Sequence, residues 1–140
     1  AEYKISIYAL FFERGLEVLA PGGKLAYITP DSFLSGKYYS KLRNLLASYA
    51  VDSITLLEFP VFDNAAIGKG VITVITKQQA AENQVCVGVA SKAGQLAKGP
   101  LFQEYRYEQQ RLGTRFSLYL NNEELEVCSA LDAFGARLSD

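Results

Sequence analysis

Three residues that could line a site in this sequence are Pro30, Asp31 and Ser32, which follow a short apolar stretch at residues 25–29. That stretch has the length and composition of a strand buried on both faces, as in a parallel sheet. Ligands of open α/β sheets bind at the carboxyl ends of such strands, so a carboxylate and a hydroxyl there could line a substrate cleft. Asp31-Ser32 is also typical of an ordinary helix N-cap, and the sequence alone favours the cap.

Other reactive side chains are scarce. The sequence contains no histidine, which argues against zinc-dependent and histidine-based catalysis. The remaining candidate bases are carboxylates in exposed-looking contexts, and no nucleophile is paired with one. Cys86 and Cys128 lie far apart and form no CxxC pair. We therefore predict reduced, packed cysteines, no metal site, no catalytic residue within the chain and a cytoplasmic location.

Length and charge limit the possible partners. The chain has 140 residues, which is one domain's worth, and 49% of them are apolar. No apolar run reaches membrane-spanning length, so no membrane partner is expected. The net charge of -1 lacks the basic surplus of a free-standing nucleic-acid binder, so any contact with DNA must be local or shared with other parts. The start at Ala1-Glu2 and the absence of methionine predict a piece of a longer protein.

Hydrophobic periodicity predicts the elements that position these residues. An amphipathic helix is expected over residues 4–19, ending at Pro21-Gly22-Gly23, where the glycines can take positive φ and reverse the chain. Its buried stripe is expected to contain Ile7, Leu10, Phe11, Val18 and Leu19, with Tyr8, Phe12 and Leu16 beside it. After it we expect a strand over residues 25–29, a helix over 38–49, and strands over 51–59 and 71–76. The loop of about ten residues before the last strand is short enough to return the chain antiparallel to its predecessor.

The pattern is weaker in the second half. Residues 84–90 alternate as in a strand, and the aromatic residues of 101–120 are expected to lie on extended segments that pack on the domain. Asn121 or Asn122 is expected to cap a last helix. The buried face of that helix is expected to consist of Leu125, Cys128, Leu131 and Phe134.

These elements, in this order, resemble a known family. The segment IYALFFERGLEVLAPGGKLAYITP, from Ile7 to Pro30, resembles the back half of an adenine-specific DNA methyltransferase domain. The subtype is the gamma type of restriction-modification and phage-defence enzymes, which follow their catalytic motif with such a helix, a Leu-Leu-Lys-Pro-Gly-Gly turn, a strand and a proline. Further matches are Ser32-Phe33-Leu34, Leu42-Arg43 in a helix, a strand leading into Val61-Phe62, and the tail Leu138-Ser139-Asp140, which is similar to the family's Leu-Gly-Asp. The resemblance covers residues 5–77 well and 84–140 loosely.

The resemblance implies an α/β fold with a partial Rossmann-like methyltransferase sheet, in which parallel strands and one antiparallel strand are flanked by helices. Residues 1–77 would form the C-terminal half of the catalytic domain. Residues 78–140 would be an extension with one or more strands and a helix, leading towards a target-recognition domain. The family's Gly-rich cofactor loop and its Asn/Asp-Pro-Pro-Tyr/Phe motif would both precede Ala1. The isolated chain is therefore expected to be inactive, and its exposed sheet edge could pair with another copy.

The family also implies a role for Phe62, in the loop after the second predicted strand. An aromatic residue there stacks on the adenine that is swung out of the duplex, because an extruded base needs an aromatic face to replace its lost stacking. The alternative is that Phe62 packs on Phe59 and Ile67.

Two more positions match family sites, and a third departs from the family pattern. Phe11 and Ile7 match residues that line the pocket for the adenine ring of the cofactor, although both also fit a plain core stripe. Lys69 could meet a DNA phosphate, although Gly68-Lys69-Gly70 departs from the small hydroxyl residue usual there. Other cations near the second helix, Lys37, Lys41 and Arg43, are expected to be mostly solvated.

The function implied is that of part of a site-specific DNA methyltransferase. The full enzyme would transfer a methyl group from S-adenosylmethionine to the exocyclic amino group of adenine in double-stranded DNA. Its partners would be the rest of its own methyltransferase domain and a target-recognition domain. The alternatives are a non-catalytic α/β interaction module, a degenerate methyltransferase subunit, or a methyltransferase acting on a small molecule or RNA. An Asn-Pro-Pro-Tyr-like motif upstream of Ala1 would favour the enzyme.

Overall fold

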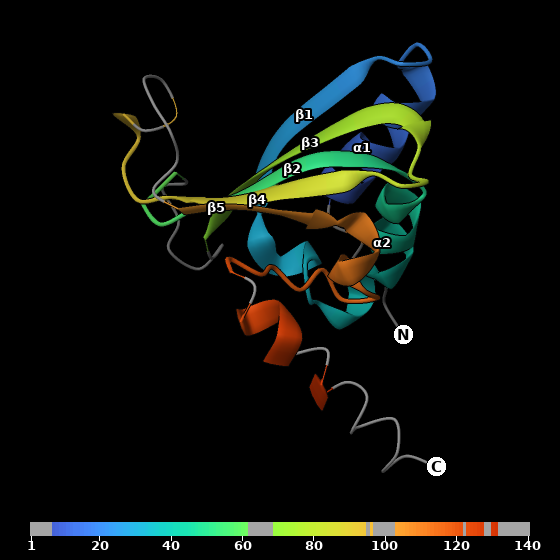
Figure 1. Cartoon of the computed structure of the whole chain (residues 1–140). Coiled ribbons are helices and arrows are strands. Elements are labelled where there is room, and N and C mark those ends of the chain that lie inside the picture. The colour runs from blue at the N-terminus through green and yellow to red at the C-terminus, as the bar shows by residue number, and fades with distance from the viewer. Residues whose placement is uncertain are drawn as a thin grey trace.

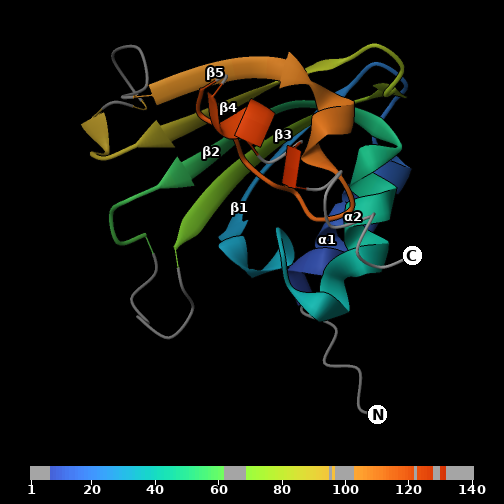
Figure 2. The same ribbon diagram turned by 60° about the horizontal axis from the view of Figure 1, so that its bottom comes forward.

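The central feature of the structure is a five-stranded mixed sheet with two α-helices packed on the same face (Figure 1). It is a computed structural model that describes residues 7–61, 69–94, 96, 103–121, 123–127 and 130–131. The opposite face of the sheet carries no helix from the described residues (Figure 2). The prediction of an α/β fold with flanking helices is confirmed.

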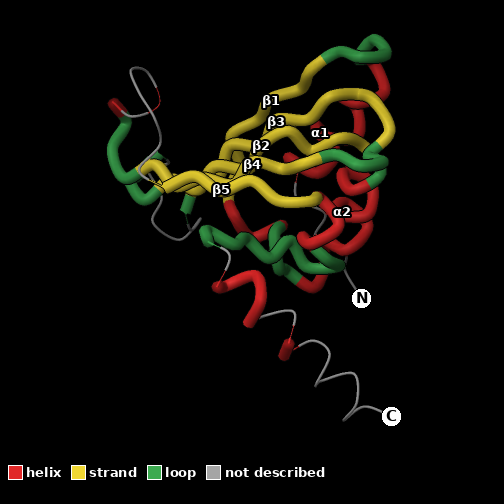
Figure 3. Tube along the Cα trace, viewed as in Figure 1, coloured by secondary structure: helices red, strands yellow, loops and turns green. Residues whose placement is uncertain are grey.

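The strands run in the spatial order β1-β3-β2-β4-β5. Their bounds are β1 Lys24–Pro30, β2 Tyr49–Leu57, β3 Gly70–Gln79, β4 Gln84–Ala90 and β5 Gln103–Glu108. β3 is antiparallel to both β1 and β2, whereas β2 and β4 are parallel, so β1, β2 and β4 all point the same way. The predicted antiparallel return after the second strand is therefore confirmed. β4 and β5 continue the same sheet beyond residue 77, and antiparallel β5 forms its far edge (Figure 3).

The helices connect and cover these strands. α1 spans Ile7–Val18 and α2 spans Ser40–Ala47. Two short 3₁₀ helices, η1 at Asp31–Phe33 and η2 at Lys37–Tyr39, join β1 to α2. A third, η4 at Gln109–Leu112, follows β5.

The turn between α1 and β1 forms where Pro21-Gly22-Gly23 predicted it. Gly22 has φ of 76°, a region that favours glycine, and its N–H donates to the Lys77 carbonyl at 2.8 Å. Gly23 has no positive φ, but a Cβ there would lie 2.8 Å from Leu19 and 2.9 Å from the carbonyl oxygen of Ala20. The first glycine is therefore needed for its backbone angle and the second for close packing.

The core lies between α1, α2 and the sheet. Phe12 is fully buried and packs edge-on against Tyr27 of β1, with ring centroids 5.1 Å apart. Phe33 of η1 contacts Phe12 at 5.9 Å and Phe116 at 6.4 Å. An aromatic cluster therefore joins α1, β1 and η1 to the segment that follows η4.

The buried stripe of α1 differs from the predicted one. The side chains of Ile7, Leu10, Phe11 and Val18 are exposed, at 70%, 51%, 56% and 68%, whereas Phe12 and Leu16 are buried. Successive helical residues are 100° apart, so Phe12 and Leu16 lie roughly on the opposite side of the helix from Ile7, Phe11 and Val18. The reason is that α1 is apolar around most of its circumference, so periodicity alone does not say which part faces the sheet.

The segment after β5 packs against α2 and the residues that precede it. The N–H of Phe116 donates to the Leu34 carbonyl at 2.9 Å, and Tyr107, Phe116 and Tyr119 are buried, so the aromatic residues pack on the domain as predicted. Residues 123–127 are helical, and Asn121 Oδ1 accepts from the N–H of Glu124 at 2.8 Å, which confirms the expected cap. Val127 and Leu131 are exposed, so Leu131 does not face the core as expected. Phe102, Cys128, Phe134 and the tail 138–140 lie outside the described residues.

Cys86 is a free, buried thiol, as predicted. Its Sγ–H donates to Glu104 Oε1 at 2.6 Å, and burial followed by that hydrogen bond raises the pKa of Cys86 from 9.0 to about 11. The thiol is therefore neutral at pH 8, and its pKa shift adds stability that is lost as pH rises from 9 through 11.

We expect Cys86 to resist alkylation in the folded protein. In a Cys128→Ser background at pH 8, its reaction with iodoacetamide should be at least about 100-fold slower than after unfolding in urea, because the thiolate fraction alone falls by that factor. Mass spectrometry of timed samples measures the rate. A native rate within threefold of the unfolded one would contradict the buried, hydrogen-bonded thiol.

Candidate functional site

Three predicted site residues lie together at the carboxyl end of β1. Pro30 is the last residue of β1 and pairs with Gly70, the first residue of β3. The N–H of Asp31 donates to the carbonyl of Lys69 at 2.9 Å. The structure thus brings Pro30, Asp31 and the Lys69 backbone to the edge where α/β sheets bind ligands.

Neither Asp31 nor Ser32 acts as a helix cap. The residue at the N-cap of η1 is Pro30, and no side chain caps this helix. Asp31 is itself the first residue of η1, so its carboxylate lies inside the turn and not before it. Among the described residues that carboxylate has no hydrogen-bond partner. The cap favoured from the sequence is therefore wrong, and Asp31 is available to another partner.

Ser32 is positioned by Tyr8, which the sequence predicts only to flank the buried stripe of the helix. The hydroxyls of Tyr8 and Ser32 lie 2.8 Å apart in a hydrogen bond. The Tyr8 ring stacks on Tyr39 with centroids 5.6 Å apart and planes 9° from parallel, and it meets Phe33 edge-on at 6.3 Å. Tyr8 therefore fixes α1 against both 3₁₀ helices that follow β1.

Ile7 and Phe11 lie one helical turn apart on the exposed face of α1. The alternative that both are plain core residues is wrong. Because their apolar surfaces are uncovered, they remain candidates for ligand contact, and their role toward a cofactor stays a prediction. Val18 and Leu10 extend this exposed apolar face.

Phe62 and its neighbours 63–68 lie outside the described residues. The flanking residues are described: Val61 and Lys69 are exposed, and both lie close to the carboxyl end of β2 and the start of β3. Lys69 has no side-chain hydrogen bond or ion pair within the described part of the chain. Its predicted contact with a phosphate therefore has no internal competitor there.

Arg43 differs most from its predicted environment. It is only 5% exposed, whereas solvation was expected, and Lys37 and Lys41 are exposed as predicted. Its Nη1 donates to the carbonyls of Phe33 and Gly36 at 2.8 and 2.7 Å, and its Nε donates to that of Thr114 at 2.8 Å. Helical spacing could have predicted the burial of Arg43, because it is three residues before buried Leu46 and lies on the same helix face.

The remaining chemistry of the described residues is limited. They contain no group of three or more metal-ligating side chains. The helices among them are all too short or too polar to form a membrane span.

Comparison with known proteins assigns the first part of the chain. Residues 1–62 match the family model of the Eco57I restriction-modification methylase. This part of the chain is similar to the restriction-modification methylases. The match confirms the resemblance inferred from the order of the sequence motifs. It does not test whether the methylated base is adenine.

A curated relative and two solved structures extend the comparison. The type II methyltransferase M.XhoI of Xanthomonas vasicola is 41% identical over 44 residues, which is 31% of this chain and 8% of that protein. The type IIG restriction endonuclease BpuSI has a TM-score of 0.58 and 16% identity, over 81% of this chain and 15% of that one. A putative class I S-adenosylmethionine-dependent methyltransferase from Listeria monocytogenes has a TM-score of 0.51 and 20% identity, over 61% and 27%.

The two structures share the fold of this chain. They support the predicted fold, a partial sheet of parallel and antiparallel strands with flanking helices. The chain spans less than a third of each of these three proteins.

Proposed function

We propose that this chain is the later part of a DNA adenine methyltransferase domain in a restriction-modification system. The whole enzyme would transfer the methyl group of S-adenosylmethionine to the exocyclic amino group of adenine. The observation that carries the proposal is the restriction-modification methylase match over residues 1–62, which includes α1, β1 and α2. The isolated chain is expected to be inactive, because the family's catalytic and cofactor motifs are not in it.

The proposed roles follow the edge at the end of β1. Pro30, Asp31 and Ser32 line the substrate cleft, and Lys69 meets a DNA phosphate. Phe62 stacks on the flipped adenine. The support is that the described members of this set lie at one edge of the sheet, with the Asp31 N–H bonded to the Lys69 carbonyl.

Phe11 and Ile7 are proposed to contact the adenine ring of S-adenosylmethionine. This role is supported by their exposure, because both are apolar side chains that no described residue of the chain buries on α1. S-adenosylmethionine supplies the electrophilic methyl group, and most of its binding residues would lie outside this chain.

The domain boundary is also a proposal. Residues 1–77 would complete the catalytic domain, and 78–140 would lead to a target-recognition domain that reads double-stranded DNA. A restriction-modification enzyme of this kind would work in the cytoplasm.

The direct test is methyl transfer by the full-length protein that carries this chain. We expect label from S-adenosylmethionine to appear as N6-methyladenine in duplex DNA, measured by nucleoside mass spectrometry. Phe62→Ala should lower kcat/KM about 5- to 150-fold, because stacking of a base on an aromatic ring contributes about 1–3 kcal/mol.

The matched control is Tyr38→Ala, which removes another aromatic ring that is 78% exposed. Its kcat/KM should stay within twofold of the wild type. Methylated cytosine, or no methylated base at all, would contradict the adenine assignment. Normal kcat/KM for Phe62→Ala with methylated adenine would remove only Phe62 from the site.

We also propose that the isolated chain self-associates through β1. Among the described strands β1 pairs only with β3, so its other edge is open, and Ile28 on it is 46% exposed. Such edges pair with other chains unless charge or cover prevents it. Ile28→Lys should shift the isolated chain from dimer to monomer, as measured by light scattering at about 50 µM. This concentration lies in the range in which exposed strand edges associate.

The control for this test is Val127→Lys, which places the same charge at another exposed apolar position, away from the sheet edge. It should leave the dimer intact. A wild-type chain that is monomeric at this concentration would contradict self-association.

A further inference from the structure

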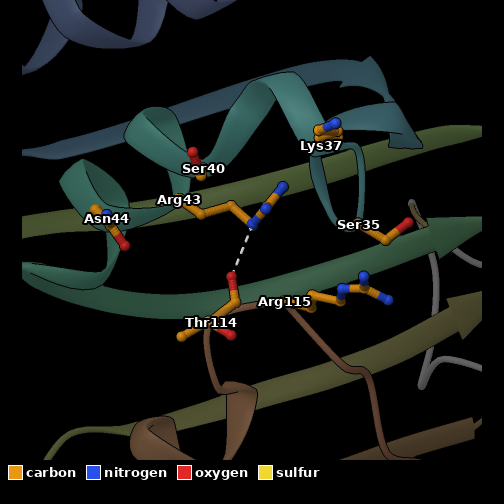
Figure 4. Close-up of a pocket in the computed structure, with 7 residues that line it drawn as sticks. All are labelled: Ser35, Lys37, Ser40, Arg43, Asn44, Thr114 and Arg115. Carbon is orange, nitrogen blue, oxygen red and sulfur yellow. Dashed lines mark hydrogen bonds between the residues drawn. The ribbon is translucent and has the colours of Figure 1, made fainter.

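A cavity of about 420 Å³, lined by polar and charged residues, lies between α2 and the segment that follows η4 (Figure 4). Lys37 of η2 and Ser40 and Arg43 of α2 line one side, and Thr114 and Arg115 line the other. None of these residues is among those assigned to the methyltransferase cleft above.

The cavity is strongly cationic. Lys37, Arg43 and Arg115 all line it, and no carboxylate does so among the described residues. The whole chain has a net charge of -1, so this concentration of positive charge is local. The described ion pairs, Arg14–Glu17 and Lys24–Asp52, involve other residues.

Arg43 is a buried cation without a counter-charge. Its three hydrogen bonds all go to backbone carbonyls, which are neutral acceptors. Its Nη2 has no acceptor within the described part of the chain. Burial and then repulsion from the charge of Arg115 lower the pKa of Arg43. A buried charge is costly unless it is paired, so an anion near Nη2 would relieve this cost.

The other polar groups of the cavity are free to join such an anion. Lys37 and Arg115 are exposed, and their side chains have no bonded partner among the residues described. Ser35, Ser40 and Thr114 also line the cavity, and Ser40 is the first residue of α2, where the helix dipole is positive.

We propose that this cavity binds a phosphate group, held by Arg43, Arg115 and Lys37 with the serine and threonine hydroxyls as further donors. Guanidinium groups match phosphate oxygens in geometry and form the stronger, charge-assisted hydrogen bonds. Three cations and several hydroxyls suit a tetrahedral group with several anionic oxygens better than a single carboxylate. The phosphate comes either from the backbone of DNA or from a free phosphate compound.

The test uses the full-length protein with Lys37→Ala and Arg115→Ala, singly and together. Neither side chain is bonded to a described residue, so both variants should fold, which circular dichroism checks. The control is Lys41→Ala, which removes the same charge from an exposed position of α2 outside the cavity. One arm titrates inorganic phosphate and pyrophosphate, followed by NMR shifts of the residues that line the cavity. The other arm measures the affinity for a short DNA duplex at several salt concentrations.

For a DNA phosphate, we expect the double variant to lose at least about tenfold in duplex affinity at low salt. The slope of log affinity against log salt should fall by about one, because one phosphate contact disappears. For a free phosphate compound, only the inorganic arm should change, with at least a tenfold weaker titration. Unchanged binding in both arms, or equal losses with Lys41→Ala, would overturn the proposal. The inorganic arm involves no methyl transfer, so its outcome is independent of the proposed enzyme activity.

Discussion

Replacing Phe12 with alanine should lower the free energy of unfolding by about 3–5 kcal/mol, one of the two largest effects expected in this chain. Phe12 is fully buried and contacts the rings of both Tyr27 and Phe33. The variant would leave a cavity where α1 meets β1 and would also lose two favourable ring contacts. Urea unfolding followed by circular dichroism measures the difference.

The neighbouring residue supplies the matched control. Phe11 is 56% exposed, so Phe11→Ala should change the free energy of unfolding by no more than about 0.5 kcal/mol. In the full-length protein it should instead weaken S-adenosylmethionine binding, by about 5-fold or more if the ring stacks on the cofactor's adenine. A larger stability loss for Phe11→Ala than for Phe12→Ala would reverse the orientation of α1 found here.

The second large effect is expected for Arg43→Ala, at about 3–5 kcal/mol of unfolding free energy. The substitution leaves three carbonyls, those of Phe33, Gly36 and Thr114, without their donor. It also removes the side-chain hydrogen bonds that join α2 to two other segments, the one that contains Phe33 and Gly36 and the one that contains Thr114. Thermal and urea unfolding should both show the loss.

Two substitutions separate the hydrogen bonds from the charge. Arg43→Lys keeps the charge but cannot reach three carbonyls, so it should recover less than half of the loss. Lys41→Ala on the same helix should stay within about 0.5 kcal/mol of the wild type, because Lys41 is exposed. An Arg43→Ala variant as stable as Lys41→Ala would contradict the buried network.

Much of the fold could be predicted from the sequence because its signals are local. Pro21-Gly22-Gly23 marks the turn, the β-branched run at residues 71–76 marks β3, and the short loop before it predicts antiparallel pairing. The predicted strand over 25–29 lies within Lys24–Pro30. These features depend on backbone preferences that neighbouring residues determine. The prediction that the strand over 25–29 is buried on both faces is wrong, because among the described strands β1 pairs only with antiparallel β3, and Ile28 is 46% exposed.

The orientation of α1 and the environment of Arg43 could not be predicted in the same way. Both depend on packing between segments far apart in the chain, such as Thr114 against α2. When a helix is apolar on most sides, the sequence does not show which side is buried. An arginine is expected to be solvated unless the positions of its carbonyl partners are known. At the candidate site, the end of β1 was predictable from the strand and Pro30, whereas the bond from Asp31 to Lys69 required the folded chain.

The strand order has a consequence for how this domain is made. β3 is the last of the first three strands to leave the ribosome, yet it lies between β1 and β2, and Lys24 must pair with Thr76. β1 and β2 do not pair with each other, so neither can form its pairing with β3 until residues 70–79 emerge. Such long-range pairing slows folding and exposes strand edges during synthesis. Translational pausing before β3 would therefore prolong the state most prone to misassembly, and pausing after it would not.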